Sequence, residues 1–422
     1  MMEGRTYFCI DMKSFYASAE CAERGLDPMT THLVVADESR GRGAICLAVS
    51  PSLKALGVKN RCRLFEIPAN LDYIIAKPRM RKYIEYAADI YEIYLDYLSP
   101  DDIHVYSIDE SFLDVTAYLN TYRTDAKSFA KKLMGEIYEK RHIPSSAGIG
   151  TNMYLAKIAL DITAKKAPDR IGYLNEELYR KTLWHHLPLS DFWMVSRGTI
   201  ARLRTKKLYT MYDIAHAPEE ILYELFGINA ELLIDHAKGI EPCTMADIKS
   251  YRGKSHSISG SQILFENYTF EQAEVVVKEM ILNGCQDLMR RKVVTSHVGV
   301  FVGYADDSAP MTGKMVRMTE NTAAYSVIIP YALEVYRKTT HKNKLIRRLA
   351  VDFADVVPEE LESYGLFTDV EKIEREKRTE ETVLNIKDKH GKNAMLRGID
   401  MLENATARER NKLIGGHNGD DE

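Results

Sequence analysis

The sequence predicts an α+β fold divided into several domains, and three observations support this prediction. A chain of 422 residues is long for a single hydrophobic core, so two to four domains are expected. Short apolar runs typical of strands interleave with helical periodicity over residues 1–170, whereas residues 171–245 are helical in pattern. Residues 254–357 return to a mixture of strand-like and helical segments.

The N-terminal segment predicts strands and helices in alternation. In chain order, the expected elements are a strand and a helix over 1–24, strands at 33–36 and 44–49, a helix at 79–98, an acidic strand at 106–114, a helix at about 124–140, a strand at 145–150 and a helix from 152. Neither a GxGxxG run nor a Walker sequence is present, so the sequence supports neither a dinucleotide-binding fold nor a P-loop.

The C-terminal half predicts a second mixed module followed by a charged tail. Strands are expected at 257–265, 297–304, 324–329 and 345–355, and helices at about 270–291 and 331–340. Residues 359–422 are charged and poor in aromatic side chains, which predicts a helix in the middle and disorder at the end.

Composition favours a cytoplasmic protein. No apolar run approaches the length of a membrane span, and the N-terminus lacks the apolar core of a signal peptide. The six cysteines are scattered without CxxC spacing, so we expect reduced thiols and neither zinc ligands nor disulfides.

A local excess of basic residues is hidden in the net charge of −4. Residues 250–358 carry 14 basic and 11 acidic side chains, whereas residues 359–422 carry 11 basic and 16 acidic ones. A basic face is what phosphate contact requires, because bound phosphates release counterions. A solvated surface of mixed charge explains the same counts equally well.

Paired carboxylates at strand ends are the most informative feature of the chain. Asp109 and Glu110 lie in a strand-like run at 106–114, and Asp11 ends another apolar strand near the N-terminus. Two strands that deliver carboxylates to one place form a divalent-metal site of the kind used for phosphoryl transfer. For an isolated Asp-Glu pair, an ordinary acidic turn would be the better interpretation.

Three motifs are found at Ile10–Glu20, Ser107–Glu110 and Ala147–Ala159. Their residues, order and spacing resemble those of the Y-family (translesion) DNA polymerases, in particular the UmuC-like bacterial subgroup. The resemblance implies a right-hand polymerase with five parts. These are a palm at 1–24 and 78–170, fingers at 25–77, a helical thumb at 171–249, a DNA-gripping little finger at 250–358 and a charged tail at 359–422.

This resemblance implies template-directed DNA synthesis of low fidelity, as used in damage tolerance and the SOS response. Nucleotidyl transfer from a dNTP to a primer 3′-hydroxyl would use two Mg²⁺ ions, with Mn²⁺ as a possible substitute. Asp11 and Asp109 would bridge both ions, Glu110 would bind the primer-side ion, and the Met12 carbonyl would complete the nucleotide-side ion. The protein is expected to act as a monomer associated with the nucleoid.

The same resemblance implies contacts with the incoming nucleotide. Phe15 and Tyr16 follow Asp11 by one helical turn, and Tyr16 takes the position of the aromatic ring that excludes ribonucleotides. Lys54 resembles the basic contact of the fingers, and Lys165 that of the palm. Both segments are one residue longer than the family pattern, so Lys166 could take the role of Lys165.

The DNA and clamp contacts are expected in the thumb and the C-terminal half. Residues 195–215 resemble a helix-hairpin-helix, although Met194, Ser196 and Lys207 stand where glycines are usual. Basic side chains expected to grip DNA are Arg290, Arg291, Lys292, Lys314 and Arg317, together with the basic run at 342–348. Leu366 and Phe367 resemble a sliding-clamp-binding peptide, and a small local helix contact is the alternative.

Two rival functions remain open at this point. A nucleotide cyclase could share a two-metal palm, but it has no duplex to hold with a thumb and a basic module. A non-catalytic interaction protein could keep the same fold, but it would not need intact Asp11, Asp109 and Glu110.

Overall fold

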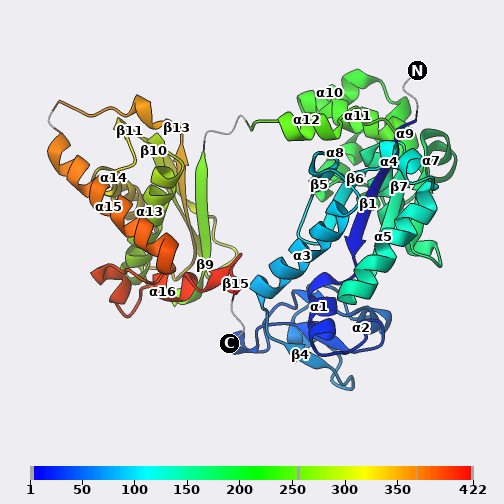
Figure 1. Cartoon of the computed structure of the whole chain (residues 1–422). Helices are drawn as coiled ribbons and strands as arrows, with labels where there is room; N and C mark the ends of the chain where they lie inside the picture. The colour runs from blue at the N-terminus through cyan, green and yellow to red at the C-terminus, as the bar shows by residue number, and fades with distance from the viewer. Residues whose placement is uncertain (1–3, 254–256, 367, 420–422) are drawn as a thin grey trace. The chain divides into compact units, whose positions relative to one another are not determined.

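The computed structural model describes residues 4–253, 257–366 and 368–419, and the chain divides into two compact units (Figure 1). One unit spans residues 4–252 together with Gly419, and the other spans 253–418. Each unit combines helices with at least one sheet, which confirms the α+β multidomain prediction. The parts of the predicted domains at residues 1–3, 254–256 and 420–422, and the predicted clamp contact of Phe367, lie outside the described residues.

The first unit is built on a five-stranded sheet in the order β5-β6-β1-β7-β8. Its strands are β1 (Tyr7–Met12), β5 (Ile103–Val105), β6 (Glu110–Asp114), β7 (Ser145–Gly150) and β8 (Ile171–Leu174). β1 is central and runs antiparallel to both β6 and β7. Its side chains alternate between the two faces, and the four residues Tyr7–Ile10 are buried on both. This strand therefore supplies a rigid base for the carboxylate at its end.

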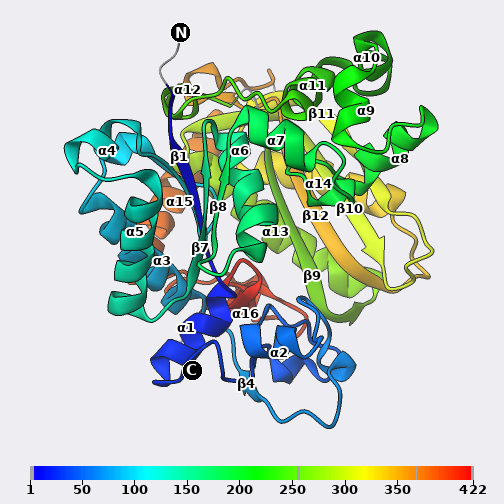
Figure 2. The same cartoon turned by 90° about the vertical axis from the view of Figure 1, so that its right-hand side faces the viewer.

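Helices cover both faces of this sheet (Figure 2). α3 (Met80–Leu95) and α5 (Ala126–Arg141) lie on one face, where the rings of Phe8 and Phe129 are 6.0 Å apart. α6 (Met153–Ile158) lies on the other face and continues into a π-helix, η4 (Ala159–Thr163). α1 (Phe15–Glu23) follows β1 directly, and α4 (Thr116–Thr121) follows β6.

A small three-stranded sheet forms the segment expected to be the fingers. β2 (Leu33–Val35) pairs antiparallel with β3 (Ala48–Val49) and parallel with β4 (Ile74–Ala76). The strand expected at 44–49 is therefore shorter than predicted. α2 (Pro51–Ala55) begins with Ser50 as its N-cap and Pro51 in the first turn, which suits a helix start.

Six short helices follow β8, as the helical pattern of 171–245 predicts. They are α7 (Glu176–Leu183), α8 (Arg197–Thr205), α9 (Met211–His216), α10 (Glu219–Phe226), α11 (Ala230–Lys238) and α12 (Met245–Ser250). Met194 and Lys207 have φ values of 66° and 59°, so two of the positions where glycine was expected do adopt the left-handed backbone. β8 itself belongs to the first sheet, although its residues lie beyond 170.

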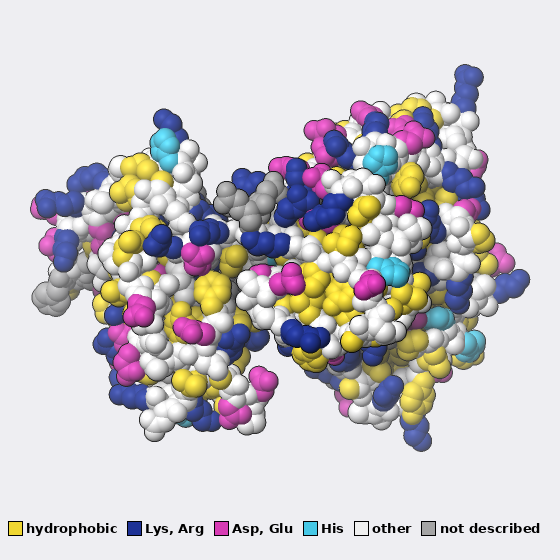
Figure 3. All heavy atoms as spheres, turned by 90° about the horizontal axis from the view of Figure 1, so that it is seen from below, with side chains coloured by type: hydrophobic (Ala, Val, Ile, Leu, Met, Phe, Trp, Pro, Cys, Tyr) yellow, Lys and Arg dark blue, Asp and Glu magenta, His cyan; other side chains and the backbone are white. Residues whose placement is uncertain are grey.

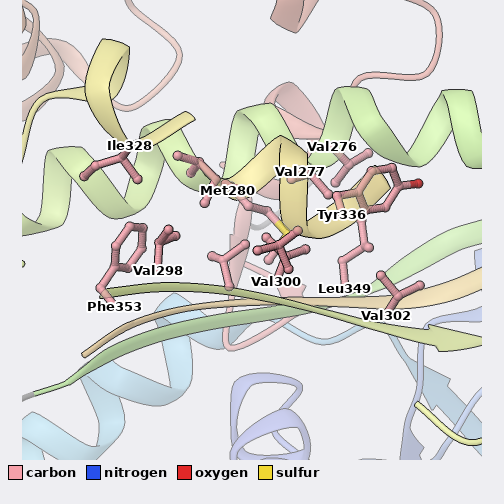
Figure 4. Close-up of a cluster of buried hydrophobic side chains, with 14 of the residues drawn as sticks. Val276, Val277, Met280, Val298, Val300, Val302, Ile328, Tyr336, Leu349 and Phe353 are labelled. Atoms are coloured by element: carbon pink, nitrogen blue, oxygen red, sulfur yellow. The ribbon is translucent and has the colours of Figure 1, made fainter. Parts of the chain in front are cut away.

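The second unit packs helices on one face of a five-stranded antiparallel sheet, in which four strands follow the order β11-β10-β12-β9 and the short β13 (Val357–Pro358) pairs with β10. Its main elements are β9 (Ile258–Tyr268), α13 (Phe270–Arg290), β10 (Val293–Tyr304), β11 (Thr312–Thr322), α14 (Tyr325–Thr339) and β12 (Ile346–Ala354). Val298, Val300 and Val302 point from β10 toward α13 and α14 and form the core with them (Figure 4). The opposite face of this sheet is left open by the helices of the unit.

One expected strand is wrong. Residues 324–329 form the start of α14, and the strand in this region is β11, which the sequence did not predict. Val327, Ile328 and Ile329 are β-branched and precede Pro330, which suggested a strand ended by proline. Pro330 instead lies inside the first two turns of α14. β11 carries several exposed polar side chains, so its hydrophobic alternation is weak.

The charged tail folds as part of the second unit. α15 (Val370–His390) agrees with the helix predicted in the middle of the tail and packs on α13. β13 (Val357–Pro358) precedes it, and α16 (Ala407–Arg410), β14 (Leu413–Ile414) and β15 (His417–Asn418) follow it. The buried carboxylate of Glu279 on α13 accepts hydrogen bonds from the backbone N–H groups of Thr406 and Ala407. The chain up to residue 418 is therefore part of this unit.

The surface carries both signs of charge. On the face drawn in Figure 3, basic and acidic side chains are interspersed on each unit, as the small net charge of −4 leads one to expect. Within the described part of the chain, no helix is both long and apolar enough to cross a membrane.

Candidate active site

Paired strands bring three carboxylate residues together at one edge of the first sheet. Asp11 on β1 lies directly opposite Glu110 on β6, so their side chains share a face. The backbone N–H of Met12 donates to the carbonyl of Asp109 at 2.9 Å, which fixes the turn before β6 against the end of β1. The three acids predicted from sequence are therefore neighbours in the structure.

This concentration of negative charge has an electrostatic cost. Burial and, to a smaller extent, the nearby carboxylates of Asp109 and Glu110 raise the pKa of Asp11 to about 7, against the opposing effect of Lys157. A divalent cation would relieve this cost, because carboxylate oxygens are the ligands that Mg²⁺ and Mn²⁺ prefer. The donor set of the site thus fits the predicted metal.

The carboxylates are also held by neighbouring donors. Cys9 Sγ donates to one oxygen of Glu110 at 3.0 Å, and Lys157 Nζ donates to the other at 2.9 Å. Burial raises the pKa of Cys9, so the thiol remains a donor. Ser107 Oγ donates to Asp109 at 2.7 Å. Among the residues that the structure describes, no three acidic, histidine or cysteine side chains form a ready metal-ligand cluster in this arrangement.

Two glycines of β7 let α6 approach closely enough for Lys157 to contact Glu110. A Cβ atom on Gly148 or Gly150 would lie 2.0–2.2 Å from backbone atoms of α6, so only glycine allows the helix to rest on β7. Asn152 caps α6 by accepting from the N–H of Leu155 at 2.8 Å. Lys157 is then 8% exposed and points to the acidic edge. Lys157 lies near the end of the third motif, and this was the available signal in the sequence, although it did not indicate a contact with Glu110.

The structure brings Lys54 close to the carboxylates. Its Nζ donates to Ser14 Oγ at 2.8 Å, just after β1. Burial lowers the pKa of Lys54, while the charge of Asp11 acts in the opposite direction. Lys165 and Lys166 are exposed in a 3₁₀ turn (Ala164–Lys166) after the π-helix η4. The wider π-helical turn accommodates the extra residue that the sequence indicated here.

Two further cations lie at the same edge and were missed from the sequence. Lys13 follows Met12, and burial, together with the charge of Arg170, lowers its pKa. Arg170 precedes β8, and its Nη1 atom is buried without a hydrogen-bond partner in the described structure. Lys13 could have been found as a basic residue inside the first motif, whereas Arg170 carried no local signal.

The two aromatic residues that begin α1, Phe15 and Tyr16, lie in different environments. Phe15 is 2% exposed, so its side chain packs inside the unit. Tyr16 is partly buried, and burial raises its pKa with a smaller contribution from the charge of Asp109. Tyr16 therefore lies within electrostatic reach of the carboxylates.

The basic residues expected to grip DNA do not share one surface. Arg317 lies opposite His297 on the open face of the second sheet, whereas Lys314 lies opposite the core residue Val300. Arg290 at the end of α13 forms an ion pair with Asp388 of α15 at 2.9 Å, and Arg291 and Lys292 are exposed beside it. Arg348, from the predicted basic run, lies opposite Gly303 and so joins Arg317 on the open face.

Comparisons with known proteins agree with this architecture. The impB/mucB/samB family model matches residues 10–161, and the model of the C-terminal domain of that family matches residues 255–366. A Bacillus subtilis protein named for UV-damage repair, UvrX, is 30% identical, and the match covers 98% of this chain and 97% of that protein. The protein DNA polymerase IV 2 of Bacillus subtilis is 29% identical, over 99% of this chain and 100% of its own length.

A solved structure shows the same fold. A Y-family DNA polymerase chimera of Dbh and Dpo4 superposes with a TM-score of 0.64 at 19% identity, and the match covers 84% of this chain and 99% of that chain. The first unit holds a sheet with carboxylates at its edge, a small three-stranded sheet and a helical part, and the second unit is an α+β module. This set of parts is that of a right-hand polymerase. The chain belongs to the impB/mucB/samB family of Y-family DNA polymerases, which confirms the resemblance seen in the three motifs.

Proposed function

We propose that the chain is a template-directed DNA polymerase that extends a primer across damaged templates with low fidelity. The observation that carries the proposal is the register of β1 with β6, which sets Asp11 opposite Glu110 beside Asp109. Relatives named DNA polymerase IV match over nearly their full length, which favours this function over a non-catalytic interaction protein. The protein is proposed to act as a monomer.

Asp11, Asp109, Glu110 and the Met12 carbonyl are the groups proposed to hold the metal. Two divalent cations would neutralise charge and align the attacking and leaving oxygens. Lys157 holds Glu110, and the N–H of Met12 holds the backbone at Asp109, so the protein fixes the carboxylates before substrate arrives. Mg²⁺ is the proposed ion, with Mn²⁺ as its substitute.

The nucleotide is proposed to lie between the carboxylates and α1. Tyr16 would exclude a 2′-hydroxyl by volume, and Phe15 would contribute through its backbone because its ring is buried. Lys54 is the strongest candidate for a triphosphate contact, because its Nζ reaches from α2 to Ser14, the N-cap of α1, where the charge of Asp11 acts on it. Lys165 or Lys166 remains a second candidate on the palm.

The open face of the second sheet is proposed to grip the DNA backbone. Arg317 and Arg348 lie on this face, opposite His297 and Gly303 of β10. Lys314, Arg290, Arg291 and Lys292 would contribute at its margins. Leu366, which is 99% exposed, and Phe367 are proposed to bind the sliding clamp.

Primer extension tests this proposal. Wild-type protein should extend a primer with dNTPs and Mg²⁺, and Asp109→Ala should abolish extension while primer-template affinity is retained. Asp114→Asn is the matched control, because Asp114 ends β6, the strand that follows Asp109, and lies opposite Tyr7, away from the three acids. Extension by Asp109→Ala at the wild-type rate would contradict the site assignment.

A further inference from the structure

A tyrosine of α3 covers one face of the Tyr16 ring. The centroids of the Tyr16 and Tyr83 rings are 4.5 Å apart, and their planes differ by 17°. Tyr83 is fully buried, at 0% exposure, so it cannot move without disturbing the packing of α3 against α1. Stacked aromatic rings restrain each other in orientation as well as in distance. The ring of Tyr16 is therefore held from behind by a fixed side chain.

Tyr83 is in turn fixed by a buried carboxylate. Its hydroxyl donates to Glu20 Oε1 at 2.7 Å, and Glu20 is 0% exposed. Arg79 donates to both oxygens of Glu20, at 3.0 and 2.9 Å. Arg24 forms a further ion pair with the same carboxylate. Both carboxylate oxygens of Glu20 therefore have hydrogen-bond or ion-pair partners. A charged group is tolerated in the protein interior when it is paired in this way.

The protonation states make this contact strong. Burial by itself would raise the pKa of Glu20, but the hydrogen bonds from Arg79, Tyr83 and Arg24 lower it overall. Burial and the charge of Glu20 both raise the pKa of Tyr83. Glu20 therefore stays ionised while Tyr83 stays protonated, and a hydrogen bond to an ionised acceptor is stronger than a neutral one.

Glu20 lies one turn after Tyr16 on α1. Residues four apart on a helix share a face, so Tyr83 contacts both of them at once, Tyr16 through its ring and Glu20 through its hydroxyl. We propose that Tyr83 and Glu20 are positioning residues for sugar selection, which hold the ring of Tyr16 against the 2′ position of the incoming nucleotide. This inference rests on the proposed role of Tyr16 as the residue that excludes ribonucleotides.

The chain offers a matched control on the same two helices. Tyr86 of α3 donates to Glu23 Oε1 of α1 at 2.9 Å and is 8% exposed. It makes the same kind of bond between α3 and α1, but its ring is not among those in contact with Tyr16 in the described residues. Tyr86→Phe therefore removes a comparable hydrogen bond and leaves the contacts among Tyr16, Tyr83 and Glu20 in place.

The experiment compares deoxyribonucleotide with ribonucleotide incorporation, as the ratio of the two kcat/KM values, in full-length protein on a primer-template. Tyr83→Leu removes the stack and should lower this ratio about two- to tenfold, the range that an aromatic pair contributes. Tyr83→Phe keeps the ring and loses the bond to Glu20, so it should produce a smaller fall in the same direction. Tyr86→Phe should leave the ratio at the wild-type value.

A double mutant separates positioning from general damage. In a Tyr16→Ala background, Tyr83→Leu should cause no further fall, because Tyr83 acts through the ring that is already gone. The inference would be overturned if Tyr83→Leu lowered the ratio as much in the Tyr16→Ala background as in the wild type. It would also be overturned if Tyr83→Leu and Tyr83→Phe both kept the wild-type ratio. If Tyr83→Leu does not fold, the Tyr83→Phe result decides. A wild-type ratio in Tyr16→Ala alone would instead refute the proposed role of Tyr16.

Discussion

Lys157 Nζ lies 2.9 Å from Glu110 Oε2, and the two side chains are 10% and 9% exposed. The pair joins α6 to β6 at the edge where the three carboxylates gather. Lys157 also pairs with Asp161 on the next turn, at 3.1 Å. One lysine thus neutralises part of the negative charge before any cation binds, and it restrains the carboxylate proposed to hold the primer-side ion.

Removing this lysine should destabilise the metal-free protein. Lys157→Met leaves Glu110 buried without a cation, and breaking a buried pair on one side costs about 3–5 kcal/mol. We expect a clearly lower Tm without divalent cation, and a partial recovery with Mg²⁺, measured by thermal unfolding.

Asp161→Asn is the control for that change, because it removes the second partner of Lys157 and leaves the bond to Glu110 intact. Its Tm should remain close to the wild-type value. Equal Tm values for Lys157→Met and wild type in the absence of Mg²⁺ would show that the pair contributes nothing.

The sequence predicted which residues meet in the candidate site better than it predicted the surfaces around it. Asp11, Asp109 and Tyr16 could be placed because motif spacing and strand periodicity are local properties of the chain. Lys157 and Arg170 could not, since the first depends on α6 resting on two glycines and the second on the pairing of β7 with β8.

Long-range packing also explains the errors in the second unit. The predicted strand at 324–329 had β-branched residues before a proline, but packing of Ile328 and Ala332 in the core favours a helix there. The tail is charged by composition, yet two buried carboxylates attach it to α13. Glu279 of α13 accepts from the backbone N–H of Thr406, and Glu380 of α15 accepts from Gln286 of α13. Neither outcome is visible in a local pattern.

Removal of the buried carboxylate of Glu279 should detach the end of the tail from α13. Glu279 is 1% exposed and accepts from Thr406 N, Thr406 Oγ1 and Ala407 N at 2.9–3.0 Å. Glu279→Ala leaves these donors unpaired, at a cost of about 1–3 kcal/mol in the free energy of unfolding. Limited proteolysis should then cut within 391–418 faster than in wild type. Glu271→Ala, an exposed position on the same helix, should be cut at the wild-type rate.

Low pH should reduce the free energy of unfolding of the second unit, because it protonates Glu274. The guanidinium of Arg337, with help from Lys278, lowers the pKa of Glu274 to about 2. A carboxyl group whose pKa is lowered by folding stabilises the protein above its ordinary pKa of 4.5, and this contribution is lost as the pH falls from 4.5 toward 2. The effect should be on the order of 1 kcal/mol, since Arg337 is half exposed and screened.

Thermal unfolding of Glu274→Gln as a function of pH tests this. The variant should be less stable than wild type at pH 6–7, and the difference should disappear near pH 2. Glu334→Gln removes an exposed pair with Lys338 on α14 and should show little difference at any pH. A difference for Glu274→Gln that does not change with pH would contradict the assignment.

DNA binding should depend on the open face of the second sheet. Arg317→Ala and Arg348→Ala should each reduce the slope of log affinity against log salt by about 1, because each removes one phosphate contact. Arg290→Ala should change the slope less, since Arg290 already pairs with Asp388. Fluorescence anisotropy with a labelled primer-template between low and moderate salt measures this. An unchanged slope in both open-face variants would place the main contacts in residues 4–252.

Recruitment to the sliding clamp should depend on Leu366 and Phe367. Leu366 is 99% exposed, and it lies between β13 and α15, which both belong to the folded second unit. An apolar side chain in that position is available to a hydrophobic pocket of a partner, and tethering to the clamp raises the effective concentration at the primer end. Replacing both residues with Ala should abolish stimulation by the clamp and leave clamp-free extension unchanged. Leu361→Ala, at an exposed leucine of the preceding 3₁₀ turn, is the control and should respond to the clamp as wild type does. If the double variant is still stimulated like wild type, the clamp contact lies elsewhere in the chain.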